Sequence, residues 1–368
     1  MRKLIKALKG LYAKFYIFCL KHREIKKFRS KKRKKIFKTI TLTKDQKKQI
    51  DFYFKKYYGK KIPYTWHRHY TAFTGNFDYR YMPELLCIPL LENVISREYY
   101  QKAMEDKNNL FFLTQGTDSI RTPKTFLSKI NGIYRNGNLQ LISYQEALSI
   151  LKNAEKCFIK PSIDSSSGRG CAILDIKDGV DLVSKSNIES IFKKYGNDFI
   201  VQEQIVPNKV ISIFNPSSVN TFRVITYILK DGTIKNTPTT FRMGRNNSFL
   251  DNAHAGGIFL SVDDEGNFGP IAFTEFNQKF SEHPDSHVKF EGYKVEQFPS
   301  VLLAAKSMHA LIPQIRIVNW DITINENGEL ILLEANMRGG SAWLPQMSSG
   351  KGMFGDDIWE LLSEVRKK

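Results

Sequence analysis

Residues 316–335 consist of two apolar runs on either side of a short polar stretch, which is the pattern of a β-hairpin. This stretch contains Asn327-Gly328, a pair that favours a two-residue type I′ turn because both central residues have a positive φ. With this turn, Asp321 faces Glu334 across the two strands. The alternation of side chains puts Asn336 on the same face. The opposite, apolar face is predicted to hold Ile322, Ile324, Ile331 and Leu333.

The facing carboxylates of this hairpin predict a bound cation. Like charges that lie directly opposite each other destabilise a strand pair unless a cation lies between them. Oxygen ligands of this kind suit Mg²⁺, which takes one or two protein carboxylates together with phosphate oxygens. We therefore predict magnesium ligands at Asp321, Glu334 and Asn336. The alternative is a solvated hairpin face with an incidental acidic pair, and a bulge or a different turn would change the register.

A short strand, a small flexible loop and a second strand precede the hairpin in the chain. The first strand (157–161) contains Lys160, the loop (162–170) reads SIDSSSGRG, and the second strand covers 171–176. Backbone N–H groups of Gly/Ser loops form anion-binding nests, and a lysine adds a point charge beside them. The pattern favours a lid over phosphate groups. It lacks the GK[ST] ending and the following helix of the P-loop, and a plain hairpin loop is the alternative.

Other periodic segments predict a mixed α+β protein, and we see no internal repeat. Strands are predicted at 199–206 and 219–229, and the polar loop at 241–257 is interpreted as a working loop. Ser143 and Glu146 form the capping box of a helix. Further helices are predicted at 97–113, 187–195, 299–311 and 356–365. Glycines after the hairpin predict a flexible segment: Gly339, Gly340, Gly350, Gly352 and Gly355.

The size and composition of the chain narrow its class. Its 368 residues can form two or three domains or subdomains. We find no apolar run long enough for a transmembrane helix and no secretory signal pattern. If their segment is a strand, His67 and His69 share one face, but no third metal ligand is in view. The cysteines have no metal-binding spacing, so we expect reduced thiols in a cytoplasmic protein: Cys19, Cys87, Cys157 and Cys171.

The net charge of +19 is concentrated at the N-terminal end of the chain. Residues 1–38 contain 16 Lys/Arg and the single acid Glu24. The run at 4–20 is apolar and aromatic with lysines along one flank, which fits an amphipathic helix on an anionic membrane surface, where each basic residue contributes about 1 kcal/mol. A helix packed on the body with a solvated charged face is one alternative. Nucleic acid is another, but the chain shows no nucleic-acid-binding fold signature.

Taken in order, five segments resemble the ATP-grasp superfamily, and more closely its branch associated with sugar transfer in polysaccharide gene clusters. They read FIKPSIDSSSGRG, VQEQIV, NPSSVNTFRVIT, RMGRNNSFLDNAHAGGI, and WDIT followed by LLEAN. The resemblance covers about Asp106 to Gly340, and an aspartate 13 residues before Glu-x-Asn is its most specific part. It implies an α+β ATP-grasp fold, in which two α+β subdomains grip ATP. The expected regions are a basic N-terminal helix (1–40), a pre-ATP-grasp region (41–118), subdomain 1 with the phosphate lid (119–206) and subdomain 2 with the metal site (207–368).

The resemblance also implies roles for individual residues. The residues expected to bind ATP are Lys107 and Lys160 at the phosphates, the lid residues Ser165, Ser166, Ser167 and Gly168, and Glu203, Gln204 and Ile205 beside the adenine. The residues expected to act in catalysis are Arg223, Lys160 and Arg242. The candidates for the acceptor side are Arg242, Arg245, Asp251 and Asn252. No carboxylate after Glu203 takes the place of the family's ribose-binding acid, which leaves the ribose contact unassigned.

The implied activity is that of an ADP-forming carboxylate–amine ligase that works through an acyl phosphate, with ATP and Mg²⁺. Its substrates would be a carboxylate and an amine, for example a uronic acid in a capsular or other cell-surface polysaccharide precursor. The basic N-terminal segment would then suit an anionic membrane surface or a lipid-linked glycan at the inner face of the membrane. The alternatives are an ATP-grasp phosphotransferase acting on a sugar or glycan, a non-catalytic nucleotide- or glycan-binding module, and a nucleic-acid-binding protein.

Overall fold

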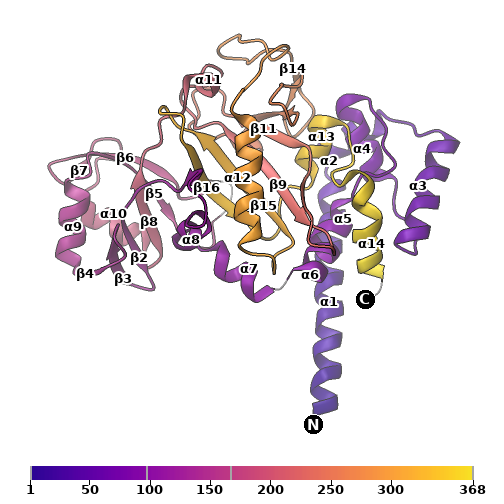
Figure 1. Cartoon of the computed structure of the whole chain (residues 1–368), viewed down its shortest axis with the longest axis horizontal. Helices are drawn as coiled ribbons and strands as arrows, with labels where there is room; N and C mark the ends of the chain where they lie inside the picture. The colour runs from indigo at the N-terminus through magenta and orange to yellow at the C-terminus, as the bar shows by residue number, and fades with distance from the viewer. Residues whose placement is uncertain (1, 97, 166–167, 367–368) are drawn as a thin grey trace.

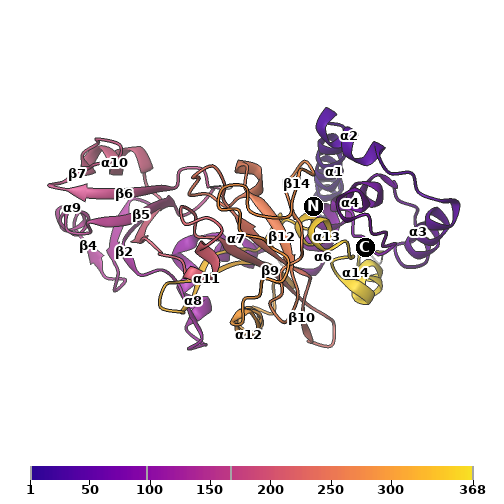
Figure 2. The same ribbon diagram turned by 90° about the horizontal axis from the view of Figure 1, so that it is seen from above.

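The computed structural model describes residues 2–96, 98–165 and 168–366, and it confirms a mixed α+β fold with two sheets. A smaller sheet, a larger sheet and a helical N-terminal region follow one another along the long axis of the molecule (Figures 1 and 2). The C-terminal helix joins the N-terminal helices at one end, so that the two ends of the chain belong to the same part (Figure 1).

The smaller sheet has seven strands in the order β4-β3-β2-β8-β5-β6-β7. Its strands are β2 (Thr125–Ile130), β3 (Ile133–Asn136), β4 (Leu141–Ile142), β5 (Lys156–Pro161), β6 (Ala172–Lys177), β7 (Val180–Asp181) and β8 (Phe199–Glu203). The helices α9 (Tyr144–Lys152) and α10 (Ile188–Tyr195) cover one face through a core that includes Leu127, Ile159 and Phe199. The predicted capping box of α9 is present, with both reciprocal hydrogen bonds between Ser143 and Glu146.

The larger sheet has nine strands in the order β1-β16-β15-β9-β11-β12-β13-β14, with β10 paired to β9. Its strands are β1 (Ile120–Arg121), β9 (Thr221–Ile228), β10 (Ile234–Asn236), β11 (Thr239–Met243), β12 (Ile258–Val262), β13 (Ala272–Phe273), β14 (Lys279–Phe280), β15 (Ile317–Ile324) and β16 (Leu330–Asn336). The helix α12 (Phe298–Ala310) packs on one face, against Phe222 and Trp320 among others. Because side chains alternate along a strand, Arg223 and Asp321 lie on the other face.

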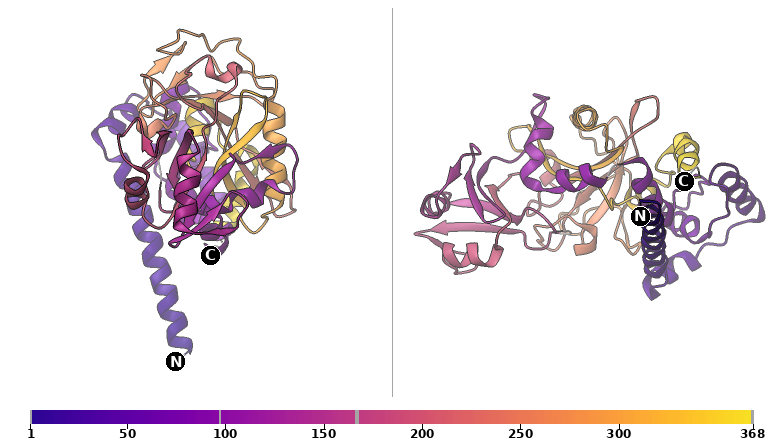
Figure 3. Two further views of the ribbon diagram at one scale, coloured as in Figure 1. Left: turned by 90° about the vertical axis from the view of Figure 1, so that its left-hand side faces the viewer. Right: turned by 90° about the horizontal axis from the view of Figure 1, so that it is seen from below.

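The helices and helical turns occupy mainly the two ends of the chain. In the N-terminal region they are α1 (Arg2–Phe28), α2 (Lys31–Lys38), α3 (Lys44–Tyr57), α4 (Thr65–Thr74), α5 (Glu84–Leu86), the π-turn η1 (Cys87–Leu91), α6 (Glu92–Ile95), α7 (Glu98–Glu105), η2 (Lys107–Asn109) and α8 (Leu110–Thr114). Later in the chain they are α11 (Lys209–Ser212), η3 (Ala253–Ala255), α13 (Trp343–Ser349), η4 (Gly355–Asp357) and α14 (Ile358–Arg366). The N-terminal half of α1 extends beyond the rest of the molecule (Figure 3). Among the described helices, none combines the length and the apolar character needed to cross a bilayer.

The hairpin β15–β16 pairs Asp321 with Glu334 as predicted, but by a different route. The two-residue turn is wrong, because the Asn325 N–H donates to the Glu329 carbonyl and leaves a three-residue loop. The longer loop shifts the pairing by one residue from the predicted register. A bulge at Leu333 shifts it back by one residue, so that Asp321 and Glu334 are paired as predicted. The prediction for the apolar face is therefore wrong in part: the core cluster under α12 contains Ile322, Ile324, Leu330 and Leu332. Ile331 is buried but, like Leu333, is not part of this cluster.

Two other local predictions are also wrong, and the segment of His67 and His69 is a helix, so the condition for a shared strand face is not met. The helix predicted at 97–113 is interrupted at Asp106, whose carboxylate caps the separate turn η2. His67 lies in the helix α4 and not in a strand. Burial in this helix lowers the pKa of His67 to about 4. The segment after Asn336 is ordered by the buried helix α13, and Gly340 serves close packing, because a Cβ there would overlap the Asn319 side chain.

Candidate functional site

A cavity of about 410 Å³ lies between the two sheets and gathers most of the predicted site residues. Those that line it are Lys107, Lys160, Ser165, Gly168, Glu203, Gln204, Ile205, Arg223, Arg242, Asp251, Asn252, Asp321, Glu334 and Asn336. Ser166 and Ser167 are outside the described residues. Arg245 is not part of the lining, because its guanidinium packs over Phe280 and its Nε donates to the Gly256 carbonyl at 2.6 Å.

The small-sheet wall of this cavity combines an apolar surface with a buried lysine. Phe158 and Lys160 alternate with Ile159 along β5 and therefore face the cavity, together with Ile173 of β6. The Lys160 Nζ donates to the Leu333 carbonyl of the opposite sheet at 3.2 Å. Burial lowers the pKa of Lys160 to about 8, although Glu334 opposes this shift. An anion placed here would relieve an energetically unfavourable buried charge.

Lys107 reaches the same space from the helical side of the molecule. Its Nζ lies 3.2 Å from the Ser165 Oγ and 3.2 Å from the Glu334 Oε1. Its backbone N–H donates to the Ser162 carbonyl, which ties η2 to the beginning of the loop after β5. The helix break at Asp106, which the sequence interpretation missed, thus directs Lys107 into the cavity.

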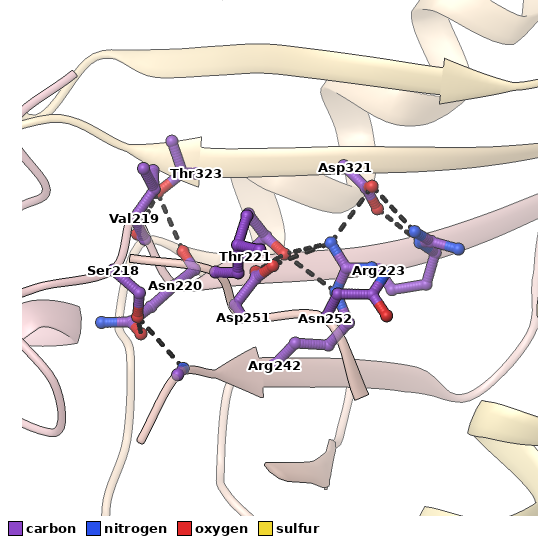
Figure 4. A network of polar contacts seen from close by, with 12 residues as sticks. Ser218, Val219, Asn220, Thr221, Arg223, Arg242, Asp251, Asn252, Asp321 and Thr323 are labelled. Carbon is purple, nitrogen blue, oxygen red and sulfur yellow. Dashed lines mark hydrogen bonds and ion pairs between the residues drawn. The ribbon is translucent and has the colours of Figure 1, made fainter. Parts of the chain in front are cut away.

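The large-sheet wall contains a network of buried ionic contacts (Figure 4). Arg223 of β9 donates to both carboxylate oxygens of Asp321, and the Arg242 Nη2 lies 3.1 Å from the Asp321 Oδ2. Arg242 also lies 3.5 Å from Asp251 and donates to the hydroxyl of Thr221, which in turn donates to Asp251. Burial alone would raise the pKa of Asp321, but the two arginines hold it below its ordinary value.

The three predicted metal ligands share one face and line the cavity, but their surroundings differ. The Glu334 side chain is one-third exposed. The Asn336 Nδ2 is buried without a partner among the described residues, and Asn336 lines the cavity. A carboxylate and an amide oxygen suit Mg²⁺. Asp321 would be free to bind the same ion only after Arg223 and Arg242 form ion pairs with other groups. The described chain contains no cluster of three His, Cys, Asp or Glu side chains placed to hold a metal.

Glu203 lies at the end of β8, where the predicted adenine contact begins. Its Oε1 accepts hydrogen bonds from the backbone N–H of Lys124 at 2.8 Å and from Arg121 at 2.5 Å. The strand pairing ends at Glu203, so the backbone groups of Gln204 and Ile205 run beyond the sheet. The sequence interpretation missed Arg121, because no motif connects it with a glutamate 82 residues away.

The loop before β12 carries Asp251 and Asn252, two of the residues predicted for the acceptor side, and both line the cavity. The Asn252 Oδ1 accepts from the backbone N–H of His254, which begins the turn η3. The His254 Nδ1 lies 2.8 Å from Glu275, and Glu275 is paired with Arg33 of α2 at 2.9 Å. The N-terminal helices are therefore connected to the rim of the cavity through a chain of polar contacts that the sequence did not reveal.

Solved structures with a similar arrangement are distant in sequence. The VanG D-Ala:D-Ser ligase from Enterococcus faecalis is 14% identical over 74% of this chain and 63% of that one, with a TM-score of 0.42. The biotin carboxylase domain of the Hydrogenobacter thermophilus 2-oxoglutarate carboxylase, solved with ADP, MgADP and bicarbonate, is 13% identical, with 75% and 48% coverage and a TM-score of 0.45. The N5-carboxyaminoimidazole ribonucleotide synthetase from Thermotoga maritima is 10% identical, with 66% and 44% coverage and a TM-score of 0.36.

The chain also matches a family model over most of its length. The chain spans about half the length of the first solved structures that it resembles, and comparison with curated proteins gave no match. A sequence model described as sugar-transfer associated ATP-grasp matches residues 91–359, which is well over half of the chain and includes both walls of the cavity. The two-sheet arrangement is the ATP-grasp fold, and the protein belongs to the sugar-transfer associated ATP-grasp family.

Proposed function

We propose that the protein is an ATP-dependent, ADP-forming ligase that joins a carboxylate to an amine through an acyl phosphate. The observation that carries this proposal is the meeting of three features in one cavity. These are the lysines Lys107 and Lys160, the oxygen ligands Glu334 and Asn336 of the hairpin, and a buried arginine pair.

ATP would lie between the two sheets. The apolar side chains of Phe158, Ile173 and Leu333 offer a surface for the purine, and the backbone beyond Glu203 offers hydrogen-bonding groups at its edge. Lys160 and Lys107 would neutralise phosphate oxygens. The loop from Ser165 to Gly168 would cover them, in the lid position that the sequence predicts.

The proposed magnesium ligands are Asp321, Glu334 and Asn336, with Asp321 available once phosphate oxygens take over its arginines. A bound Mg²⁺ would supply neutralisation of the charge on the phosphate oxygens. Arg223 and Arg242 are positioned at the cavity by their ion pairs before substrate binds, and they would exchange these carboxylate partners for phosphate oxygens to stabilise the transferring phosphoryl group.

The reaction itself needs no side-chain nucleophile. An oxygen of the substrate carboxylate attacks the γ-phosphorus, and the bond to ADP breaks to leave an acyl phosphate and ADP. The amine then attacks the acyl carbon, phosphate leaves, and the amine loses a proton to give the amide. The role of the protein is to orient the groups and to exclude water from the acyl phosphate.

The sugar-transfer association of the family supports a glycan precursor as the substrate, with amidation of a uronic acid as the specific case. Arg242, Asp251 and Asn252 line the cavity and remain our candidates for the acceptor side. We leave Arg245 out of this set, because its guanidinium is directed to Phe280 and Gly256.

Product mass tests the reaction. The protein is incubated with ATP, Mg²⁺ and a panel of uronic acids and amines, and ADP release is followed together with mass spectrometry. We expect ADP release that depends on both substrates and a product with the mass of the amide. Lys160→Met should abolish turnover, whereas Lys129→Met, a matched change on the opposite face of the same sheet, should retain it. A gain of phosphate without amine would identify a phosphotransferase, and no ADP release with any pair would contradict catalysis.

We also propose that α1 attaches the protein to an anionic membrane surface at the inner face of the membrane. The large apolar side chains Leu8, Leu11, Tyr12, Phe15 and Phe18 are exposed and follow one another at helical spacing along one face. Basic residues dominate the same segment. The other end of α1 is fixed to the body, where Glu24 and Phe28 are buried. Such a helix suits the interface of an anionic bilayer.

The attachment would bring the active site close to the membrane. Tyr16 of α1 contacts Arg338, both through its hydroxyl and through its ring, and Arg338 directly precedes the cavity residue Gly339. This supports a lipid-linked glycan as the carrier of the substrate. Co-sedimentation with phosphatidylcholine vesicles, with and without phosphatidylserine, tests the attachment.

We expect binding only to the vesicles that contain phosphatidylserine, and loss of binding in Leu11→Asp/Phe15→Asp. The matched control is Phe52→Asp, which changes an equally exposed apolar residue of α3. Equal binding by both variants would contradict the proposal. A protein that does not bind the vesicles but self-associates through α1 would contradict it as well.

A further inference from the structure

A second cavity, of about 710 Å³, lies on the β2–β3 side of the smaller sheet. The helical side contributes Asn108 and Phe111, and the uncovered face of the sheet contributes Ser128 and Arg135. The turn after β3 closes one end, where Gly137 approaches the Thr125 carbonyl too closely for any Cβ. This close approach of two backbone segments fixes the position of the turn.

The charge of this cavity has one sign. The charged residues that line it are Lys107, Lys124 and Arg135, and the described lining contains no Asp or Glu. The Nε of the Arg135 side chain is buried and has no hydrogen-bond partner among the described residues. Arginines held next to a sheet for structural reasons normally have an acid or carbonyl partner, as Arg121 and Arg316 do in this molecule. Arg135 therefore has binding capacity for an anion.

The same lining contains two buried amides with unused acceptors. Asn108 and Gln202 are each 4% exposed, and the Oδ1 of the former and the Oε1 of the latter have no partner among the described residues. The orientation of each amide is fixed by its nitrogen, which donates to Asp106 in one case and to the Pro123 carbonyl in the other. An unsatisfied buried acceptor costs about 1–3 kcal/mol. Hydroxyl groups of a ligand are donors that could reduce this cost.

We infer that this cavity is a binding site for an anionic sugar, separate from the nucleotide cavity. The carboxylate or phosphate of the sugar would bind Arg135 and Lys124, its hydroxyls would donate toward Asn108 and Gln202, and its ring would lie against the apolar side chain of Phe111. The volume is in the usual range for small-molecule sites. This inference stands independently of the ligase reaction.

Occupancy of the two cavities should be coupled. Lys107 and Gln202 line both of them, so a sugar in the second cavity changes the surroundings of two residues that contact the nucleotide space. By linkage, any effect of the sugar on nucleotide affinity equals the effect of the nucleotide on sugar affinity.

Isothermal titration calorimetry of the full chain tests the site. The probes are glucuronate, glucose 1-phosphate, glucose and inorganic phosphate, each titrated with and without saturating ADP. We expect the two anionic sugars to bind more tightly than glucose or phosphate, also in the presence of ADP. The relative affinity of glucuronate and glucose 1-phosphate identifies the preferred anion. Absence of binding by both, or complete loss of binding with ADP, would overturn the inference.

Two variants locate the binding within the sheet. Arg135→Gln should weaken the anionic sugars about tenfold or more, which corresponds to the loss of a charge-assisted hydrogen bond. Lys129→Gln removes a positive charge from the neighbouring strand, where the side chain lies over the Tyr134 ring on the opposite face, and should have no effect. Equal affinities for the two variants would overturn the assignment. Thermal unfolding of both variants checks that the fold is retained.

Discussion

The two walls of the proposed nucleotide cavity differ in how their buried charges are neutralised. On the large-sheet wall, Arg223 and Arg242 face Asp321 and Asp251, so that each of these buried charges has a partner within its own wall. On the small-sheet wall, Lys160 is buried just as deeply and hydrogen-bonds a neutral carbonyl. We therefore expect a bound anion to neutralise the charge on the small-sheet wall, whereas the charges on the large-sheet wall already have partners.

Because of this difference, we expect substitutions on the large-sheet wall to affect the stability of the fold and substitutions on the small-sheet wall to affect ligand binding. A buried ion pair that loses one partner leaves an uncompensated charge, which destabilises the fold strongly. A buried charge without an acidic partner is already unfavourable, so its removal weakens ligand binding and not the fold. The same kind of substitution on the two walls should therefore have different consequences.

Asp321→Asn should produce the largest loss of stability, because it leaves two buried guanidinium groups without their shared carboxylate. We expect the free energy of unfolding to fall by about 3–5 kcal/mol, measured by urea denaturation. Glu334→Gln is the matched control, because its side chain is one-third exposed, and it should change the stability far less. An Asp321→Asn variant as stable as the wild type would refute the proposed difference between the walls.

Glu92 should make the stability depend on pH. It is buried in α6, where it accepts a hydrogen bond from Gly339 beside the large-sheet wall, and burial raises its pKa from 4.5 to about 8. Between these values the folded state binds a proton that the unfolded state does not, so the free energy of unfolding falls as the pH rises from 4.5 to 8.

The expected contribution of Glu92 is on the order of a few kcal/mol. Glu92→Gln should remove it, so that the stability of the variant relative to the wild type increases between pH 5 and pH 8. Denaturant unfolding at several pH values measures this difference. A difference that stays constant with pH would show that Glu92 does not titrate in this range.

Lys160→Met should separate binding from stability on the small-sheet wall. We expect ATP affinity to fall about 10- to 100-fold, as for a lost charge-assisted hydrogen bond, with the free energy of unfolding unchanged or raised. Calorimetry with ATP and urea denaturation of the same preparation measure the two quantities. A loss of stability as large as that expected for Asp321→Asn would remove the distinction between the walls.

Arg121→Gln should have the smallest effect. Arg121 joins Glu203 to Glu329 in partly exposed ion pairs, and such pairs contribute about 0–1 kcal/mol to stability. We expect a change of this size in urea denaturation and a decrease of a few-fold in ATP affinity through the altered position of Glu203. A loss of several kcal/mol would indicate that this contact holds the two sheets together.

The sequence predicted the parts of the site that lie within one strand or one loop. Lys160 and its loop follow from a short strand next to a Gly/Ser segment, and Asp321 faces Glu334 as expected. The pairing was reached through two errors that cancel, because four consecutive apolar residues from Leu330 to Leu333 do not reveal which one is bulged. Pattern alone fixes a strand there but not its register.

Contacts between distant segments were not predictable from pattern. The pairing of Arg223 with Asp321 joins residues that are 98 positions apart, and no sequence pattern connects the two positions. The helix α13 was missed because glycines on both sides of 343–349 suggested a flexible segment, although the apolar residues between them are buried in the core. Gly340 allows close packing against Asn319, and a glycine needed for close packing cannot be told from one in a mobile segment by sequence alone.

The bulge gives this hairpin one residue that its pairing does not use. At the present length, a loop with three residues and a bulge at Leu333 together keep Asp321 opposite Glu334. After a one-residue deletion in the loop, the same pair is kept either by a two-residue turn with the bulge retained or by a three-residue turn with Leu333 paired. Because Leu330 to Leu333 are all apolar, both arrangements fill the core, and an engineered shortening of the turn by one residue should retain the acidic pair.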